Sequence, residues 1–420
     1  MPWILMADMR QMWIISASWS MESLHINSGN YTYDGIELGG ERIALEVEDT
    51  LGSLEAQGSP FTKLSIVGYS LGGLVARYAI GLLYSRGWFD KLEPVNFTTF
   101  ASPHVVVRMP WDGLYSYLWN SLGPRSISMS GKQLFLVGSF LDSGKPLLSI
   151  LADPDSVFVR ALARFKHRCV YANIVNDRST VFYTTAISII DPFQQDLEYT
   201  PINYVDGYER VVIDSNVYTL RLSKAQKQLP FISQIWQQIE QVAINLPVSL
   251  FVVVLITVVL PFFLVNSAIQ TLRSRQRIRL HEEGKSGAPF AQYRIPLLVK
   301  DVQHAVEDVF EDIRELQIKQ RTSAKNTTTV KDKTNAFVET SPIETQSQGL
   351  STDNRYPALT LTPTQISIIE SLNSVGFRKY PVYIHNHRHS HAAIIRRVPK
   401  KGFDEARIVI KHWLDQEFEI

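Results

Sequence analysis

The strongest constraint on the fold is the pentapeptide Gly68-Tyr69-Ser70-Leu71-Gly72, which lies between a compact apolar run at 64–67 and a helix-forming stretch at 71–85. The pattern G-x-S-x-G in this context is typical of a serine nucleophile held on a sharp strand-to-helix turn. We therefore predict Ser70 as a nucleophile. The N-terminus of the following helix predicts the backbone N–H of Leu71 as an oxyanion donor. The alternative is a glycine-rich turn that only packs a helix against a strand.

Short apolar strands alternate with helices along much of the chain. Apolar residues at helical spacing predict a helix over 40–57, and apolar runs predict strands at 95–101, 169–175 and 381–384. A last helix is predicted from about residue 404 to 416. This alternation predicts an α/β fold with a mostly parallel sheet that is covered by helices.

The composition is that of a globular protein with a substantial core, because 45% of the 420 residues are apolar and 20% are charged. The net charge of +1 gives no reason to expect nucleic acid as a partner. Cys169 is the only cysteine, which excludes an internal disulfide framework and favours a reducing compartment. Asp8 and Arg10 interrupt the apolar N-terminus, so no persuasive secretion signal is found.

A carboxylate and then a histidine should follow the nucleophile in chain order if the fold is an α/β-hydrolase. Asp177 lies two residues beyond the predicted strand that ends at Val175, at the sheet edge where functional groups usually lie. We predict Asp177 as the acid, and an Asn-Asp turn is the alternative. The weaker candidates, which do not directly follow a clear strand, are Asp142, Asp153 and Asp191.

The base should lie between the last strand and the last helix, where four histidines alternate: His385, His387, His389 and His391. Alternate residues of a strand share one face and could bind a metal. However, no carboxylate or cysteine lies among them, and arginines are adjacent. We therefore predict no metal and no cofactor, and we choose His391 as the base, with His389 and His387 behind it. His391 would take the proton of Ser70 as the hydroxyl attacks an ester, and Asp177 would orient the imidazole.

Five longer motifs are YDGIELGGER at 33–42, SIVGYSLGGLVARY at 65–78, FASPH at 100–104, YANIVNDR at 171–178 and SHAAI at 390–394. Together they resemble the fungal serine esterase and lipase family, and within it most closely the lipid-droplet phospholipase branch. The likeness runs from about residue 30 to the C-terminus. It implies a carboxylic ester hydrolase that acts on glycerophospholipids, with Ser70, Asp177 and His391 as the triad by position.

The chain departs from this family in two places. Members carry a His-Gly motif on an early strand, whose loop supplies the second oxyanion donor, but no His-Gly occurs in the 69 residues before Ser70. Those residues are also too few for the usual early strands and a crossover helix. Either another N-terminal backbone group substitutes, or the chain is truncated or inactive. Val106 stands where members commonly have glycine after Pro-His.

Residues 246–265 are twenty uncharged residues, enough to span about 30 Å of hydrocarbon as a helix. The predicted nucleophile and acid precede this run and the base follows it, so a single crossing would separate them. We expect the run to enter and leave a membrane or droplet monolayer on the same side, bent at Pro247 and Pro261. A buried core or lid helix is the alternative.

The flanks of this run also favour a lipid surface. Upstream, an apolar stripe typical of an interfacial helix is formed by Ile232, Ile235, Trp236, Ile239 and Val242. Downstream, four arginines are expected to meet anionic headgroups: Arg273, Arg275, Arg277 and Arg279. We expect residues 229–280 to bind a lipid droplet or the endoplasmic reticulum, with the catalytic domain facing the cytosol.

The predicted organisation has six parts. They are a divergent N-terminal segment (1–29), the first part of the hydrolase domain (30–228), the membrane-associated segment (229–290), a helical segment (291–318), a disordered insertion (319–355) and the C-terminal part of the hydrolase domain (356–420). The leading prediction is a serine hydrolase that cleaves acyl esters of phospholipids or acylglycerols at a membrane or droplet surface. The alternatives are a lipid acyltransferase with the same triad, a membrane-binding relative with an incomplete oxyanion hole, and a single-pass membrane protein.

Overall fold

The strands of the protein form one parallel sheet in the order β2-β1-β3-β4-β5-β6. They are β1 (Pro2–Ala7), β2 (Ser20–Leu24), β3 (Lys63–Tyr69), β4 (Glu93–Phe100), β5 (His167–Asn173) and β6 (Arg378–Val382). The computed structural model describes residues 2–7, 20–24, 34–58, 62–110, 120, 129–141, 143–177, 179–193, 202–214, 269, 271–280 and 359–420. Because every neighbouring pair is parallel, the carboxyl ends of all these strands lie along one edge of the sheet.

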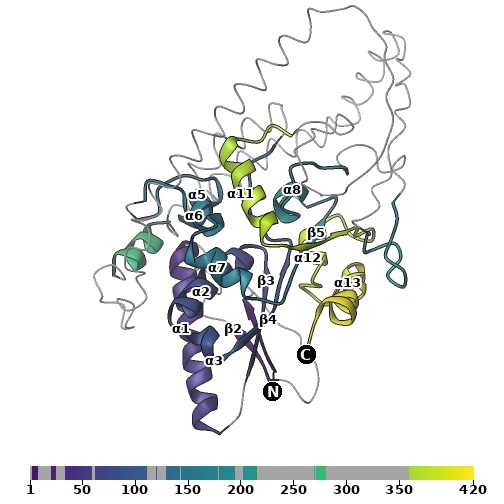
Figure 1. Ribbon diagram of the computed structural model, residues 1–420. Coiled ribbons are helices and arrows are strands. Elements are labelled where there is room, and N and C mark those ends of the chain that lie inside the picture. The colour runs from purple at the N-terminus through teal and green to yellow at the C-terminus, as the bar shows by residue number, and fades with distance from the viewer. Residues whose placement is uncertain are drawn as a thin grey trace, which may run out of the picture.

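Helices cover both faces of the sheet, and each face has its own apolar core (Figure 1). One core contains side chains of α1 (Ile36–Ala56), α2 (Leu71–Ser85), α3 (Trp88–Lys91), α6 (Leu147–Ala152), α7 (Val157–Ala163) and α11 (Pro363–Ser374). The other core contains side chains of α12 (Ser390–Ala393) and α13 (Ala406–His412). Two further short helices are α5 (Met129–Leu134) and α8 (Phe182–Thr185), and residues 269 and 271–280 are also helical.

The helices α1 and α2 differ in how their apolar residues are spaced, because α2 is buried on all sides and α1 on one side only. In α2 every residue from Leu71 to Leu83 is buried, as expected of a helix that is apolar all round. In α1 the buried Ile43, Val47 and Leu51 recur at helical spacing, and the opposite face is polar. The amphipathic α1 therefore packs over the wholly buried α2.

Residues 359–420 return to the first half of the fold through β6, which pairs with β5. The helix α11 that leads into β6 begins with a capping box between Thr362 and Gln365, which satisfies free N–H groups at its start. Ser371 then donates a hydrogen bond to the carbonyl of Ala152 at the end of α6. The C-terminal part of the chain is thereby attached to the sheet and to one of its covering helices.

The structure confirms the predicted α/β class with a parallel sheet, and the strands near 64–67, 95–101, 169–175 and 381–384 are present with shifted ends. One expectation is wrong. Residues before α1 are numerous enough for two early strands, β1 and β2, which extend the sheet beyond β3. These strands were missed because their sequences, PWILMA and SMESL, lack a clear alternation and lie among polar interruptions.

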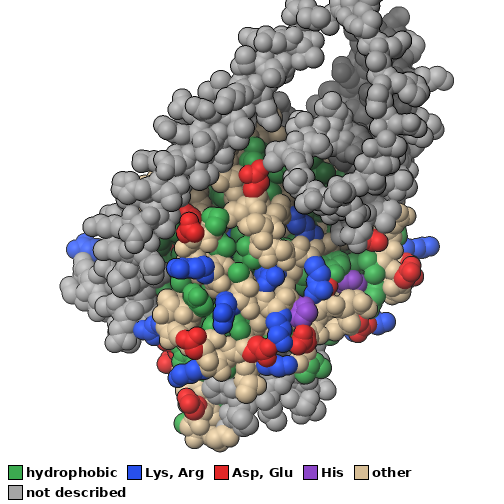
Figure 2. All heavy atoms as spheres, in the orientation of Figure 1, with side chains coloured by type: hydrophobic (Ala, Val, Ile, Leu, Met, Phe, Trp, Pro, Cys, Tyr) green, Lys and Arg blue, Asp and Glu red, His purple; other side chains and the backbone are tan. Residues whose placement is uncertain are grey.

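The predicted membrane run 246–265 and the predicted insertion 319–355 lie outside the described residues. Within the described part of the chain, no helix combines the length and the apolar character needed to cross a bilayer. On the face seen in Figure 2, Lys and Arg side chains are interspersed with Asp and Glu side chains. This mixture agrees with a net charge close to zero.

Candidate active site

Ser70 occupies a strained turn between β3 and α2. Its backbone angles are φ 54° and ψ −129°, a conformation that non-glycine residues rarely adopt. The turn is held because the Ser70 N–H donates to the carbonyl of Phe100 at 3.0 Å and the Gly73 N–H donates to the carbonyl of Ser70 at 3.2 Å. The serine side chain is thus presented at the carboxyl end of the strand, as a nucleophile requires.

Two glycines allow the backbone to approach closely at this turn. A Cβ atom on Gly68 would lie 2.5 Å from the Cα atom of Gly73. A Cβ atom on Gly73 would lie 2.3 Å from the hydroxyl oxygen of Ser102. Gly73 lies just outside the G-x-S-x-G pentapeptide, so the packing requirement extends one residue further than that pattern indicates.

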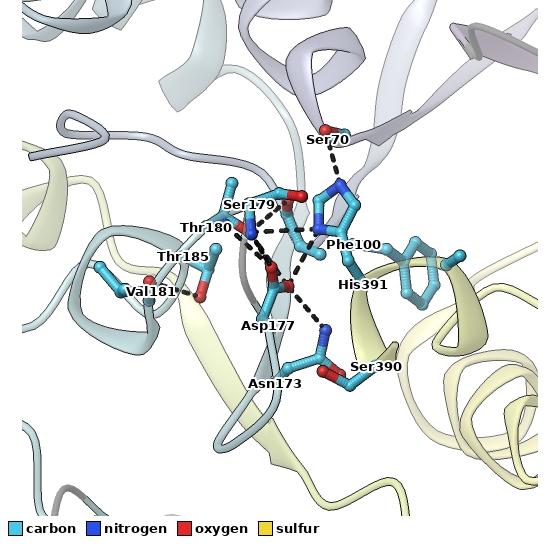
Figure 3. Close-up of polar contacts among 12 residues, drawn as sticks. Ser70, Phe100, Asn173, Asp177, Ser179, Thr180, Val181, Thr185, Ser390 and His391 are labelled. Atoms are coloured by element: carbon cyan, nitrogen blue, oxygen red, sulfur yellow. Dashed lines mark hydrogen bonds and ion pairs between the residues drawn. The ribbon is translucent and has the colours of Figure 1, made fainter. Parts of the chain in front are cut away.

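The structure brings Ser70, His391 and Asp177 into one chain of hydrogen bonds (Figure 3). The distance from Ser70 Oγ to His391 Nε2 is 2.9 Å, and the distance from His391 Nδ1 to Asp177 Oδ2 is also 2.9 Å. With the Nδ1 proton donated to the carboxylate, Nε2 has a free lone pair that accepts the hydroxyl proton of Ser70. This is the geometry of a serine that can be deprotonated as it attacks.

Parallel topology explains how residues 321 positions apart meet. Ser70 follows β3, Asp177 follows β5, and His391 lies in α12 beyond β6. The carboxyl ends of these strands share an edge, so the loops that leave them converge there.

The carboxylate of Asp177 is buried and accepts several hydrogen bonds besides that of His391. Oδ1 accepts the N–H groups of Ser179 at 3.0 Å and Thr180 at 2.8 Å. Oδ2 accepts from the Asn173 amide at 2.9 Å and the Thr180 hydroxyl at 3.1 Å. Burial, the largest influence, raises the pKa of Asp177, but the bond and charge of His391 together with the other donors outweigh it and leave this pKa below its usual value.

The imidazole of His391 is positioned by neighbours from two other loops. The Tyr69 hydroxyl donates to the backbone carbonyl of His391 at 2.9 Å, and the Ser390 hydroxyl donates to the carbonyl of Val175 at 2.7 Å. The Thr180 hydroxyl also lies 3.3 Å from His391 Nδ1. Sequence reasoning did not assign roles to Tyr69, Thr180 or Ser390, although Tyr69 and Ser390 lie within the family-like motifs.

The predicted oxyanion donor, the backbone N–H of Leu71, lies at the start of α2. Leu71 is the first residue of this helix, so its N–H belongs to the group that has no partner within the helix. On the other side, the pairing register places Ala7 opposite Gly68, so β1 ends beside the turn that carries Ser70. The residues that follow Ala7 lie outside the described part of the chain.

The other alternating histidines bond to groups outside the Ser70–His391–Asp177 chain. His385 Nε2 donates to the carbonyl of Arg210 at 2.6 Å, and His387 Nδ1 accepts the N–H of His389 at 3.0 Å. His389 caps α12 by accepting the N–H of Ala392. Among the described residues, no group of three or more His, Cys, Asp or Glu side chains is arranged to hold a metal ion.

The weaker aspartate candidates stabilise local turns. Asp153 accepts the N–H of Asp155, and Asp191 accepts the N–H of Phe193. Burial raises the pKa of Asp191 to about 6. Asp142 lies outside the described residues.

The loop after β4 accommodates Val106, which the sequence comparison flagged as a departure. Val106 is fully buried, and its N–H donates to the Thr184 hydroxyl at 3.0 Å. The buried His104 is 2.8 Å from the Thr99 hydroxyl through Nε2, and its carbonyl accepts from Arg77. Burial lowers the pKa of Arg77 to about 9. None of the described hydrogen bonds joins these groups to Ser70.

Residues 19–188 match the model of a protein family described as "Putative serine esterase (DUF676)". This stretch belongs to that serine esterase family. The match to DUF676 includes Ser70 and Asp177 and ends before His391. His391 is therefore connected with the family stretch by the hydrogen bonds of the site and by the resemblance of its surrounding motif.

Curated relatives of this serine esterase stretch are fungal proteins named as lipases. "Putative lipase C4A8.10" of Schizosaccharomyces pombe is 31% identical over 169 residues, which are 39% of this chain and 21% of the relative. "Putative lipase ROG1" of Saccharomyces cerevisiae is 37% identical over 133 residues, which are 31% of this chain and 18% of the relative. The chain thus matches about a fifth of the length of these relatives. No solved structure matches.

Proposed function

We propose that the protein is a serine hydrolase that cleaves acyl esters of lipids, with Ser70, His391 and Asp177 as its catalytic residues. The observation that carries this proposal is the continuous hydrogen-bonded chain from the Ser70 hydroxyl through the imidazole to a buried carboxylate. The match of residues 19–188 to a serine esterase family supports the reaction class. The names of the fungal relatives support a lipid substrate.

In the proposed reaction, Ser70 Oγ attacks the ester carbonyl while its proton passes to His391 Nε2. The Asp177 carboxylate stabilises the resulting imidazolium through Nδ1–H. The tetrahedral intermediate collapses when Nε2–H protonates the departing alcohol oxygen, which leaves an acyl group on Ser70. Water then attacks the acyl carbon and gives a proton to Nε2. The second tetrahedral intermediate collapses as Nε2–H returns this proton to Ser70 Oγ, which breaks the bond between Ser70 and the acyl group and frees the fatty acid.

The developing negative charge on the carbonyl oxygen needs donors that are fixed before the reaction begins. We assign one donor to the Leu71 N–H, at the N-terminus of α2. We assign the second to a backbone group close to the end of β1, because Ala7 pairs with Gly68, two residues before Ser70. On this proposal the chain has a second oxyanion donor although it lacks the His-Gly motif that usually marks one.

The finer proposal is a phospholipase or acylglycerol lipase at a lipid droplet or the endoplasmic reticulum, with its catalytic part facing the cytosol. Three features support it: the motif resemblance to the droplet phospholipase branch, the uncharged run 246–265, and the order of the catalytic residues on either side of that run. A hairpin insertion keeps Ser70 and His391 on the same side of the lipid, whereas a single crossing would not.

The proposal is tested with the purified full-length chain in detergent and a soluble short-chain ester. Ser70→Ala should lower the rate by about 10⁴-fold or more, because the attacking atom is removed. Ser179→Ala is the matched control, since Ser179 lies in the acid loop but bonds Asp177 through its backbone N–H. Equal rates for Ser70→Ala and the unchanged protein would contradict the proposal. Fatty acid release from phosphatidylcholine and from triacylglycerol then separates the two lipid classes.

A further inference from the structure

A buried ion pair attaches the arginine-rich segment to the hydrolase domain. The Asp34 side chain is 0% exposed and lies just before α1. It accepts from Arg277 Nε at 2.9 Å and from a terminal guanidinium nitrogen of Arg277 at 2.5 Å, and Arg42 of α1 donates to it at 2.7 Å. The expectation that all four arginines of this segment meet headgroups is therefore wrong for Arg277, which points inward.

The segment that carries Arg277 is helical at residue 269 and over 271–280, and it lies beside the start of α1 (Figure 1, green). Ser274 is buried, so Ser274 and Arg277 define the face that contacts the domain. The helix holds four arginines and no acidic residue between 269 and 280. Its outer face is consequently both cationic and accessible.

The outer face carries both apolar and cationic side chains. With about 100° between successive residues, three exposed apolar side chains fall on one side, opposite Ser274. They are Leu272 (63% exposed), Ile269 (43%) and Leu280 (39%). The exposed Gln276 falls within this apolar strip. The exposed Arg273 lies at one edge of the strip, and the exposed Arg275 and Arg279 lie at the other.

Such an arrangement fits the boundary of an anionic lipid layer. The apolar strip can enter the acyl boundary while the arginine stems lie along it and their guanidinium groups reach the phosphates. Guanidinium groups also form paired hydrogen bonds with phosphate oxygens. The uncharged run 246–265 ends only a few residues before Ile269, so a chain leaving a lipid layer would enter this helix directly. This continuity favours a lipid surface over an acidic protein.

We infer that the helix over 269–280 binds anionic phospholipid headgroups through Arg273 and Arg275, and that the Arg277–Asp34 pair fixes this helix to α1. The inference deepens the proposed function and rests on it for the lipid surface. Its consequence is that the active site keeps a set position relative to the lipid layer, because the lipid-facing helix and the hydrolase domain are joined by a buried contact.

The test measures binding of the full-length chain to sedimenting vesicles of phosphatidylcholine, with and without phosphatidylserine. Each arginine near an anionic surface strengthens binding about fivefold, so Arg273→Gln with Arg275→Gln should weaken binding to the mixed vesicles about 25-fold. The matched control is Arg160→Gln with Arg164→Gln, two exposed arginines on and just after α7. The control should change binding less than twofold.

Hydrolysis of a soluble ester is measured on the same samples. The Arg273/Arg275 variant should keep the unchanged rate, which shows that the fold and the active site are intact. Equal binding of this variant and the unchanged protein to mixed vesicles would overturn the inference. Absence of any preference for phosphatidylserine would also overturn it and would direct attention to an acidic protein surface. Failure of the unchanged protein to hydrolyse the soluble ester would instead refute the proposed function.

Discussion

Asp177→Asn changes one atom of the site and reverses the hydrogen-bond polarity around it. Oδ1 already accepts two backbone N–H groups, so the new amide should keep its oxygen there. Its nitrogen then replaces Oδ2 and faces His391 Nδ1, the Asn173 amide and the Thr180 hydroxyl. The imidazole can satisfy this nitrogen only by accepting at Nδ1, which moves its proton to Nε2.

An imidazole with a proton on Nε2 cannot accept the proton of Ser70. By comparison with the same substitution in other triads, the rate at neutral pH should fall about 10⁴-fold. The Asn173 amide also loses its acceptor, and a buried unsatisfied donor costs about 1–3 kcal/mol of stability. The variant should therefore lose far more activity than stability.

The assay is kcat/KM on a soluble ester, with the free energy of unfolding measured in parallel by denaturant titration. Asp191→Asn is the matched control, because Asp191 is also buried but, among the described residues, accepts a hydrogen bond only from the Phe193 N–H. That control should retain activity within about twofold, since surroundings that already disfavour the charge tolerate a neutral side chain. Activity of Asp177→Asn within tenfold of the unchanged protein would refute the assignment of the acid.

Three further outcomes follow from the structure. Gly73→Ala should destabilise the fold by about 1–3 kcal/mol and lower esterase activity, because its Cβ would collide with the Ser102 hydroxyl; normal melting and activity would contradict the packing argument. Burial lowers the pKa of His412 to about 4, so the unfolded chain binds more protons below pH 6.5 and stability should fall from there toward pH 4. His412→Gln should remove this part of the loss of stability on acidification, as measured by urea titration at each pH. An equal pH dependence in the variant and the unchanged protein would exclude this contribution of His412. Arg277→Met should lower stability by about 1–3 kcal/mol, because Asp34 then keeps only Arg42 as a described partner. Hydrolysis of a soluble ester should persist. Unchanged thermal unfolding would argue against a stabilising role of the ion pair.

The positions of the three predicted catalytic residues followed from topology and needed no side-chain detail. Short buried strands separated by helices indicate parallel pairing, and parallel pairing places Ser70, Asp177 and His391 at one edge. The order of nucleophile, acid and base along the chain then leaves few candidates. The choice of His391 over its neighbours depended on the surrounding motif, since periodicity alone does not distinguish the four alternating histidines.

The supporting contacts of the site could not be predicted in the same way. The Thr180 hydroxyl touches both the acid and the base because a tight turn follows Asp177, and the rotamer of Thr180 is set only in the folded protein. Tyr69 occupies the variable position of the pentapeptide, and its hydroxyl bonds the carbonyl of His391, 322 residues away. Such partners have no local signal, because their distance in sequence exceeds any periodic pattern.

Contacts between residues that are distant in sequence also explain why two other predictions differ from the structure. Arg277 was assigned to a lipid surface from its cationic neighbours, yet its partner Asp34 lies 243 residues earlier in the chain. β1 and β2 have weak strand patterns by themselves, and their pairing with β3 and with each other defines them. In both segments the structure is determined by tertiary contacts and not by local composition.

The most direct test of the account is mass spectrometric mapping of an alkyl fluorophosphonate, which reacts with serine hydroxyls that a neighbouring base has activated. The full-length chain should be phosphonylated on Ser70, and His391→Ala should slow this labelling by several orders of magnitude. Labelling of another serine, or an equal rate on Ser70 when His391 is replaced, would contradict the activation of this hydroxyl by that imidazole.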